Sequence, residues 1–116
     1  MILRTAQVAR SEYEWAQHLK MAREAGVREA QIAAMADWRG SGEFDAKERA
    51  ALALTDAVMA CNVSDAVHAE VKQHFSDAEF IELSLTAGFY AMVSRMIDAL
   101  RVELDEDVRD YRPKLP

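Results

Sequence analysis

Glu14 and His18 are the two residues of this 116-residue sequence whose types and spacing best suit proton chemistry. They are four residues apart, so a helix would place them one turn from each other on the same face. A carboxylate beside an imidazole stabilises the charged ring, which would make His18 a general acid usable near neutral pH. Trp15 and Tyr13 lie next to them and are candidates for substrate binding. An ordinary surface or capping pair is the alternative.

Arg95 is a further candidate, because an arginine that faces a pocket can hold a substrate carboxylate. It also lies three residues before Asp98, so an ion pair between the two is the structural alternative, which we rate higher. His68 and His74 are six residues apart and do not share a helical face for a metal; we expect both to face solvent. We predict no metal site and no cofactor.

Composition limits the classes of partner. Hydrophobic residues make up 51% of the chain, enough for one folded domain. The net charge of -6 leaves no basic stripe, so we expect neither a nucleic-acid partner nor a membrane partner, but a small molecule or another protein. The single cysteine, Cys61, excludes an intrachain disulfide, suits a reducing compartment and is expected to be buried as a small apolar residue. With no signal peptide in the sequence, we expect a cytoplasmic protein.

Apolar spacing and helix start signals predict an all-α fold of five to six helices without strands. A serine or aspartate followed three residues later by glutamate, the capping box, occurs at Ser11, Asp45 and Ser76. Gly26 suits a left-handed helix end. The predicted helices cover residues 1–10, 11–26, 27–38, 45–61, 64–75 and 77–101. The first has no cap in front of it, which suggests the second half of a longer helix or a frayed end.

The predicted helix over residues 77–101 is apolar on nearly every side, which is typical of a buried helix. Other helices or other subunits must then cover it, so we predict a homo-oligomer. Gly88 in its interior costs about 1 kcal/mol relative to alanine. A neighbouring helix that crosses closely at this point would explain the glycine.

Four segments together resemble one known superfamily. They are residues 13–18 (Tyr-Glu-Trp-Ala-Gln-His), 22–26 (Ala-Arg-Glu-Ala-Gly), 48–52 (Glu-Arg-Ala-Ala-Leu) and 88–95 (Gly-Phe-Tyr-Ala-Met-Val-Ser-Arg). In their order and spacing they are similar to the carboxymuconolactone decarboxylase-like, or alkylhydroperoxidase D-like, superfamily. The resemblance implies a compact all-helical domain over residues 1–116, without the N-terminal helices of longer members. It also implies a trimer or a hexamer.

Members of the peroxidase branch use a Cys-x-x-Cys pair followed by a histidine four residues on, and His18 matches that histidine. Ser11 and Glu14 occupy the two cysteine positions, so this chain lacks the thiols that disulfide chemistry needs. The glutamate of the peroxidase proton relay would precede Met1. What remains is closer to the cysteine-free decarboxylase branch, which acts on a cyclic lactone acid from aromatic catabolism.

The resemblance therefore implies a lyase that acts on a small lactone carboxylic acid, in which His18 transfers a proton and Glu14 orients it. The first alternative is a non-catalytic, oligomeric binding protein of the same family. The second is an alkylhydroperoxidase D-like, peroxiredoxin-type antioxidant protein that has lost its redox cysteines. If the protein is an enzyme, a decarboxylase is favoured over a cysteine-dependent peroxidase.

Overall fold

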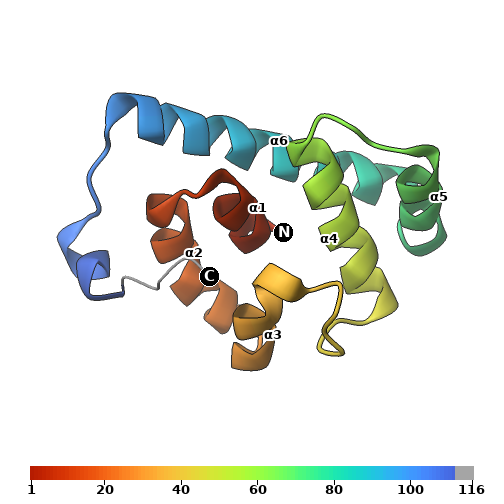
Figure 1. Ribbon diagram of the computed structural model, residues 1–116, viewed down its shortest axis with the longest axis horizontal. Coiled ribbons are helices and arrows are strands. Elements are labelled where there is room, and N and C mark those ends of the chain that lie inside the picture. Colours follow the sequence, from red (N-terminus) through yellow and green to blue (C-terminus); the bar gives the residue numbers. More distant parts are fainter. Residues whose placement is uncertain (112–116) are drawn as a thin grey trace.

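The computed structural model describes residues 1–111, which fold into six α-helices and two short 3-10 helices (Figure 1). No strand occurs among these residues, so the prediction of an all-α fold with five to six helices is confirmed. The elements are α1 (Ile2–Ala9), α2 (Glu12–Glu24), α3 (Glu29–Ala34), η1 (Met35–Asp37), α4 (Ala46–Met59), α5 (Asp65–His74), α6 (Asp77–Leu100) and η2 (Glu106–Tyr111).

Two of the three predicted capping boxes form in full, at the starts of α4 and α6. At α2 only half of the box forms: the Glu14 amide donates to Ser11 Oγ over 3.3 Å, but the Glu14 side chain does not return to Ser11. The reason lies in α1, which ends at Arg10 in the left-handed conformation (φ 54°). This turn lets the Ser11 amide donate to the Ala6 carbonyl oxygen instead, over 2.9 Å. The carboxylate of Glu14 is thereby released from the cap.

The hydrophobic core lies between α1, α2, the α3–η1 segment and the start of α4 (Figure 1). Trp15 of α2 is at its centre with only 2% of its surface exposed. Around it lie buried side chains from every one of these elements: Leu3, Ala6, Leu19, Ile32, Met35, Trp38, Phe44 and Leu52. α2 is therefore anchored by its tryptophan, which fixes the direction in which His18 points.

α6 runs along the long axis of the molecule and contacts α1 and α4 on one side only (Figure 1). The face that it buries carries small residues, Ala87, Ala91 and Ser94. Six of its large apolar side chains lie on the opposite face and are exposed. Helices of the same chain therefore cover only one face of α6, and the cover by other subunits that the sequence also allowed stays a prediction. By length and composition alone, α6 could also cross a membrane. The exposed face requires its own explanation.

The predictions for two residues at helix ends, Gly26 and Cys61, have different outcomes. Gly26 follows α2 with φ 90°, in the left-handed region predicted for it. Cys61 follows α4 and is also left-handed, with φ 52°, and its thiol is exposed. The expectation of a buried Cys61 is therefore wrong, because the left-handed turn directs this side chain away from the core.

Candidate active site

His18 is held by hydrogen bonds at both ring nitrogens. Its Nδ1 lies 2.9 Å from the carbonyl oxygen of Glu14, and its Nε2 lies 3.2 Å from the hydroxyl of Tyr90 on α6. A backbone carbonyl oxygen can only accept a hydrogen bond, so Nδ1 carries the proton. In the neutral ring Nε2 is then an acceptor for the Tyr90 hydroxyl. The two rings meet edge to face with centroids 4.8 Å apart, and α2 is thus joined to α6 at the imidazole.

The Glu14 carboxyl is buried next to the same ring. Its Oε2 lies 3.2 Å from His18 Nδ1, but the Nδ1 proton points to the Glu14 carbonyl oxygen, which leaves Oε2 without a well-directed hydrogen bond. Burial raises the pKa of Glu14, and the attraction of His18 offsets this only in part. The expected pairing of Glu14 with His18 is therefore present, but the backbone of Glu14 orients the ring as much as its side chain does.

Replacing Glu14 with Gln is expected to stabilise the protein at pH 7, by about 1 kcal/mol, because it removes a charge that is buried without a good partner. The folded pKa is raised above the unfolded value of roughly 4.3. The stability that protonated Glu14 contributes is therefore complete below pH 4 and is lost as the pH rises through the folded pKa. Melting temperatures from pH 4 to pH 8 should show a gap between variant and parent that opens with rising pH.

Glu12→Gln is the matched control, since Glu12 is an exposed residue of the same helix turn, and it should show no such gap. A Glu14→Gln protein that melts below the parent at pH 7 would instead mean that an ionised Glu14 is the preferred partner of a charged His18.

His18 and Tyr90 line a cavity of about 480 Å³ between α1, α2 and α6. Its walls are apolar, with Leu3, Met21 and Val27 among them, and Thr86 adds a hydroxyl from α6. No arginine or lysine occurs among the described residues that line it. A cavity of this size and character, with a few convergent polar groups, is typical of a site for a small organic molecule.

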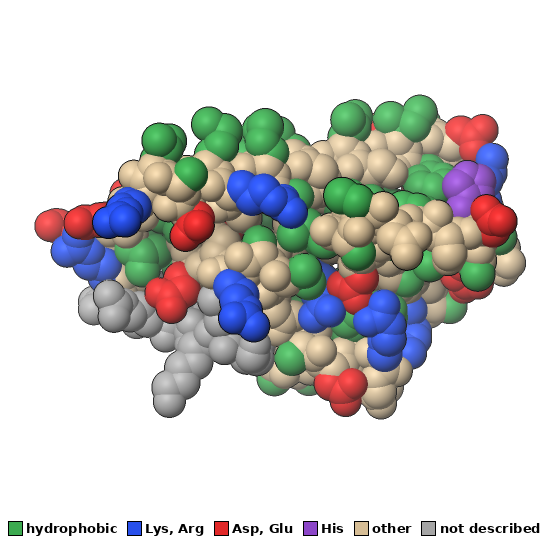
Figure 2. All heavy atoms as spheres, turned by 45° about the horizontal axis from the view of Figure 1, so that its top comes forward, with side chains coloured by type: hydrophobic (Ala, Val, Ile, Leu, Met, Phe, Trp, Pro, Cys, Tyr) green, Lys and Arg blue, Asp and Glu red, His purple; other side chains and the backbone are tan. Residues whose placement is uncertain are grey.

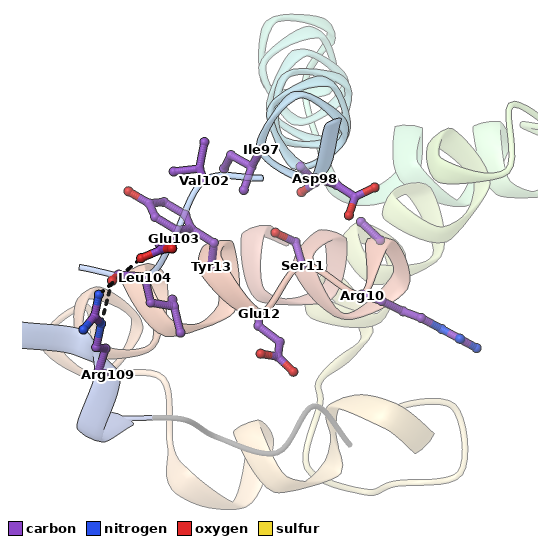
Figure 3. A pocket seen from close by; sticks show the side chains of 12 residues that line it. Arg10, Ser11, Glu12, Tyr13, Ile97, Asp98, Val102, Glu103, Leu104 and Arg109 are labelled. Carbon is purple, nitrogen blue, oxygen red and sulfur yellow. Dashed lines mark hydrogen bonds and ion pairs between the residues drawn. The ribbon is translucent and has the colours of Figure 1, made fainter. Parts of the chain in front are cut away.

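A second cavity, of about 560 Å³, lies at the start of α2 and shares no lining residue with the first. Figure 3 shows Ser11 and Tyr13 on its α2 side and Ile97 and Asp98 on its α6 side. Tyr13 lies here, not beside His18, and its hydroxyl donates to Asp105 over 3.3 Å. Burial and the nearby Asp105 carboxylate raise the pKa of Tyr13.

The other two predicted binding residues do not line the His18 cavity either. Trp15 lies in the core and lines neither cavity. Arg95 is an exposed residue of α6 that lines a smaller hollow together with Asp98, and its guanidinium donates to the carbonyl oxygen of Ala91 over 2.7 Å. Of the five predicted site residues, the structure brings together His18 and Glu14.

Tyr90 and Thr86, which α6 contributes to the His18 cavity, were not predicted from the sequence as site residues. They are four residues apart and therefore lie on one helical face. Their spacing can be seen in the sequence, but a single tyrosine in an apolar helix is more typical of core packing than of a binding site. No local sequence pattern indicates that His18, 72 residues earlier, lies next to Tyr90.

Two comparisons with known proteins bear on this fold and site. Residues 1–57 match the model of the carboxymuconolactone decarboxylase family. A crystal structure of a protein of unknown function from Agrobacterium tumefaciens, provisionally described as the antioxidant defence protein AhpD, superimposes with a TM-score of 0.83. The two sequences are 27% identical over 89% of this chain and 73% of the other. The superfamily expected from the sequence is confirmed.

The comparison with curated proteins gave no match. The family match contains Glu14 and His18 but ends before α6. Within this superfamily, the contribution of Tyr90 therefore rests on the geometry of this chain and not on a matched motif.

Proposed function

We propose that the cavity beside His18 binds a small carboxylic acid with a mostly apolar body, such as a lactone acid, and that His18 transfers a proton during its decarboxylation. One observation carries this proposal: a directed chain of hydrogen bonds from the Glu14 carbonyl through the imidazole to the Tyr90 hydroxyl, at the wall of an apolar cavity. The match to the carboxymuconolactone decarboxylase family supports the choice of reaction.

The geometry suits the proton transfer that such a reaction needs. Cleavage of the bond to the carboxylate releases carbon dioxide and leaves the electron pair on the substrate carbon, and that carbon takes a proton from Nε2 of the charged ring. Nδ1 keeps its own proton throughout, because the Glu14 carbonyl holds it. The neutral Nε2 then accepts from the Tyr90 hydroxyl until solvent restores the lost proton. A general acid placed in this way accelerates a reaction by roughly 10²- to 10⁴-fold.

A second function, binding without chemistry, is favoured by one feature of the cavity. None of its described lining residues is an arginine or a lysine, so among the side chains that line the cavity only a charged His18 could pair with a carboxylate. Arg95, the anion anchor considered from the sequence, donates elsewhere. A site of this kind can hold a weakly polar ligand without activating it.

The test combines binding and turnover on one set of compounds. Carboxymuconolactone and simpler five-membered lactone acids are each added to the parent protein and to His18→Gln, and melting temperature and carbon dioxide release are recorded. The proposal expects a higher melting temperature and release of carbon dioxide with the parent, and loss of the release with the variant. Stabilisation without product supports the binding function, and release that survives in His18→Gln contradicts the proton-transfer role.

Any peroxide turnover by this protein should be independent of its thiol. Cys61 is the single cysteine of the chain, is exposed, and does not line the His18 cavity. Alkylation of Cys61 should therefore leave the rate of peroxide consumption unchanged, measured with the alkylated and untreated proteins side by side. Loss of a robust activity on alkylation, or in Cys61→Ser, would show that Ser11 and Glu14 are not vacated redox positions.

A further inference from the structure

We infer that the exposed face of α6 pairs with the same face of a second copy of this chain, in antiparallel orientation. Figure 2 shows hydrophobic side chains gathered along the edge of the molecule where α6 runs. Six of them each expose between 48% and 69% of their surface: Ile81, Leu85, Phe89, Met92, Met96 and Leu100. Successive members are three or four residues apart, so they form one continuous stripe along the helix.

The stripe complements itself when it is reversed. If α6 is laid against an antiparallel copy with Gly88 opposite Phe89, then Leu85 falls opposite Met92 and Ile81 falls opposite Met96. Each of these contacts then occurs twice, because in a two-fold interface residue i meets residue j and residue j meets residue i. Leu100 lies outside this match, since in this register it falls opposite Asp77 at the start of α6. The apolar side chains from Ile81 to Met96 therefore form the contact.

Gly88 supports this register. A methyl group added at Gly88 would meet nothing within 4 Å in the single chain, so the close crossing predicted from the sequence does not occur within one molecule. In the antiparallel pair, the ring of Phe89 from the second copy lies over the notch that Gly88 leaves. The glycine, which costs helix stability, is then explained by a neighbour outside the chain.

The size and charge of the face favour a second copy over a membrane. With about 200 Å² for each large side chain, the six offer on the order of 700 Å², close to the roughly 800 Å² that each partner of a standard interface buries. Insertion into a membrane would not require the side chains of α6 to match those of an antiparallel copy. It is also helped by a basic rim, whereas this face is flanked by Glu82 as well as Arg95, in a chain of net charge -6.

The two-fold pairing restricts the assembly to an even number of subunits. Of the two assemblies expected from the sequence, a hexamer can contain such a two-fold contact and a trimer by itself cannot. The pairing does not rest on the proposed function, since Leu85, Phe89 and Met92 do not line the His18 cavity. Phe89 does contact the ring of Tyr90, with centroids 5.3 Å apart, and for that reason it is left unchanged in the test.

The experiment pairs two charged variants. Leu85→Glu and Met92→Lys should each weaken self-association by roughly 100-fold or more, because each buries charges in an apolar contact. Sedimentation velocity should show each variant alone as a smaller species than the parent. An equimolar mixture should recover the parent's mass. In the mixed pair, one of the two 85–92 contacts joins the new carboxylate of one variant to the new ammonium group of the other. The second 85–92 contact keeps the original Leu85 and Met92 side chains. Native mass spectrometry should show one copy of each in the pair.

Two controls fix the interpretation. Leu85→Glu mixed with Met96→Lys places the new charges out of register and should not recover the mass. Val63→Glu adds the same charge to an apolar residue exposed outside α6 and should leave the assembly intact. Circular dichroism of every variant shows which of them fold. The mixture of folded variants then tests the register.

Several results would overturn the inference. A parent protein that is monomeric at micromolar concentration, or has an odd number of subunits, has no α6 two-fold. A mixture of folded Leu85→Glu and Met92→Lys that stays dissociated refutes the antiparallel register. Binding of a monomeric parent to phosphatidylcholine vesicles, lost in Leu85→Glu, would assign the face to a membrane.

Discussion

Replacing His18 with Gln is expected to lower the rate of the reaction in the cavity by roughly 10²- to 10⁴-fold, the usual contribution of a general acid. Glutamine keeps most of the size of the imidazole and part of its hydrogen bonding but has no proton that titrates. The ring is partly buried and is not the centre of the core, so the variant should fold and assemble as the parent does. Rates under single-turnover conditions, with melting temperatures alongside, separate the two effects.

Two variants calibrate that result. Tyr90→Phe removes only the hydroxyl that meets Nε2 and should cost about 5- to 10-fold, the worth of one hydrogen bond. His68→Gln makes the same chemical change at an exposed histidine of α5 and should cost nothing. If His18→Gln left the rate intact, or only unfolded the protein, the histidine would be a structural cap on α2.

Replacing Asp56 with Asn is expected to destabilise the protein by about 2–3 kcal/mol at pH 7, because it breaks a largely buried ion pair. Asp56 of α4 accepts from Arg4 Nε of α1 over 2.6 Å, from Trp38 Nε1 over 3.2 Å and from Arg39 over 2.7 Å. Asparagine has one acceptor oxygen instead of two and turns its amide donors toward these donors. The melting temperature should fall by about 10 °C.

The pH dependence of this loss has a definite sign. Burial raises the pKa of Asp56, but the hydrogen bonds and charges of Arg4 and Arg39 outweigh it, so the folded pKa is lowered. The stability contributed by Asp56 is therefore present above the unfolded value of about 3.9 and is lost as the pH falls through the folded pKa. The difference between parent and variant should be constant from pH 7 to pH 5 and shrink below pH 4.

Asp65→Asn is the control for this prediction, since Asp65 is exposed in the first turn of α5 and should cost only a few tenths of a kcal/mol. An Asp56→Asn variant as stable as the parent at pH 7 would mean that the free energy lost in burying the charges is as large as the free energy gained from their contacts.

The helices could be predicted from the sequence because their signals are local. Asp45 and Ser76 cap the helices that they were expected to start, and Gly26 follows α2 in the left-handed conformation. The face shared by Glu14 and His18 follows from a spacing of four residues, and the structure brings these side chains together. Each of these inferences needs only the residues of one turn.

What the sequence could not supply depends on contacts between distant segments. The partner of His18 Nε2 is 72 residues away, and the partner of Arg4 is 52 residues away. Neither pair carries a local pattern. The Ser11–Glu14 box failed for a similar reason, because the turn at the end of α1 supplied a different acceptor for the Ser11 amide. The sequence also left open whether helices of the same chain or other subunits cover α6, because hydrophobicity along a helix does not say which molecule covers it.

The tautomer of His18 and its response to a ligand test the central claim most directly. Long-range ¹H–¹⁵N spectra of protein labelled in its three histidines resolve the two nitrogens of each ring. At a pH where the rings are neutral, His18 should have a protonated Nδ1 and an unprotonated Nε2, since the Glu14 carbonyl fixes the first. A lactone acid that raises the melting temperature should shift the His18 signals and leave those of His68 and His74 unchanged. A protonated Nε2 on the neutral His18, or a stabilising ligand that leaves His18 unmoved, would contradict the account.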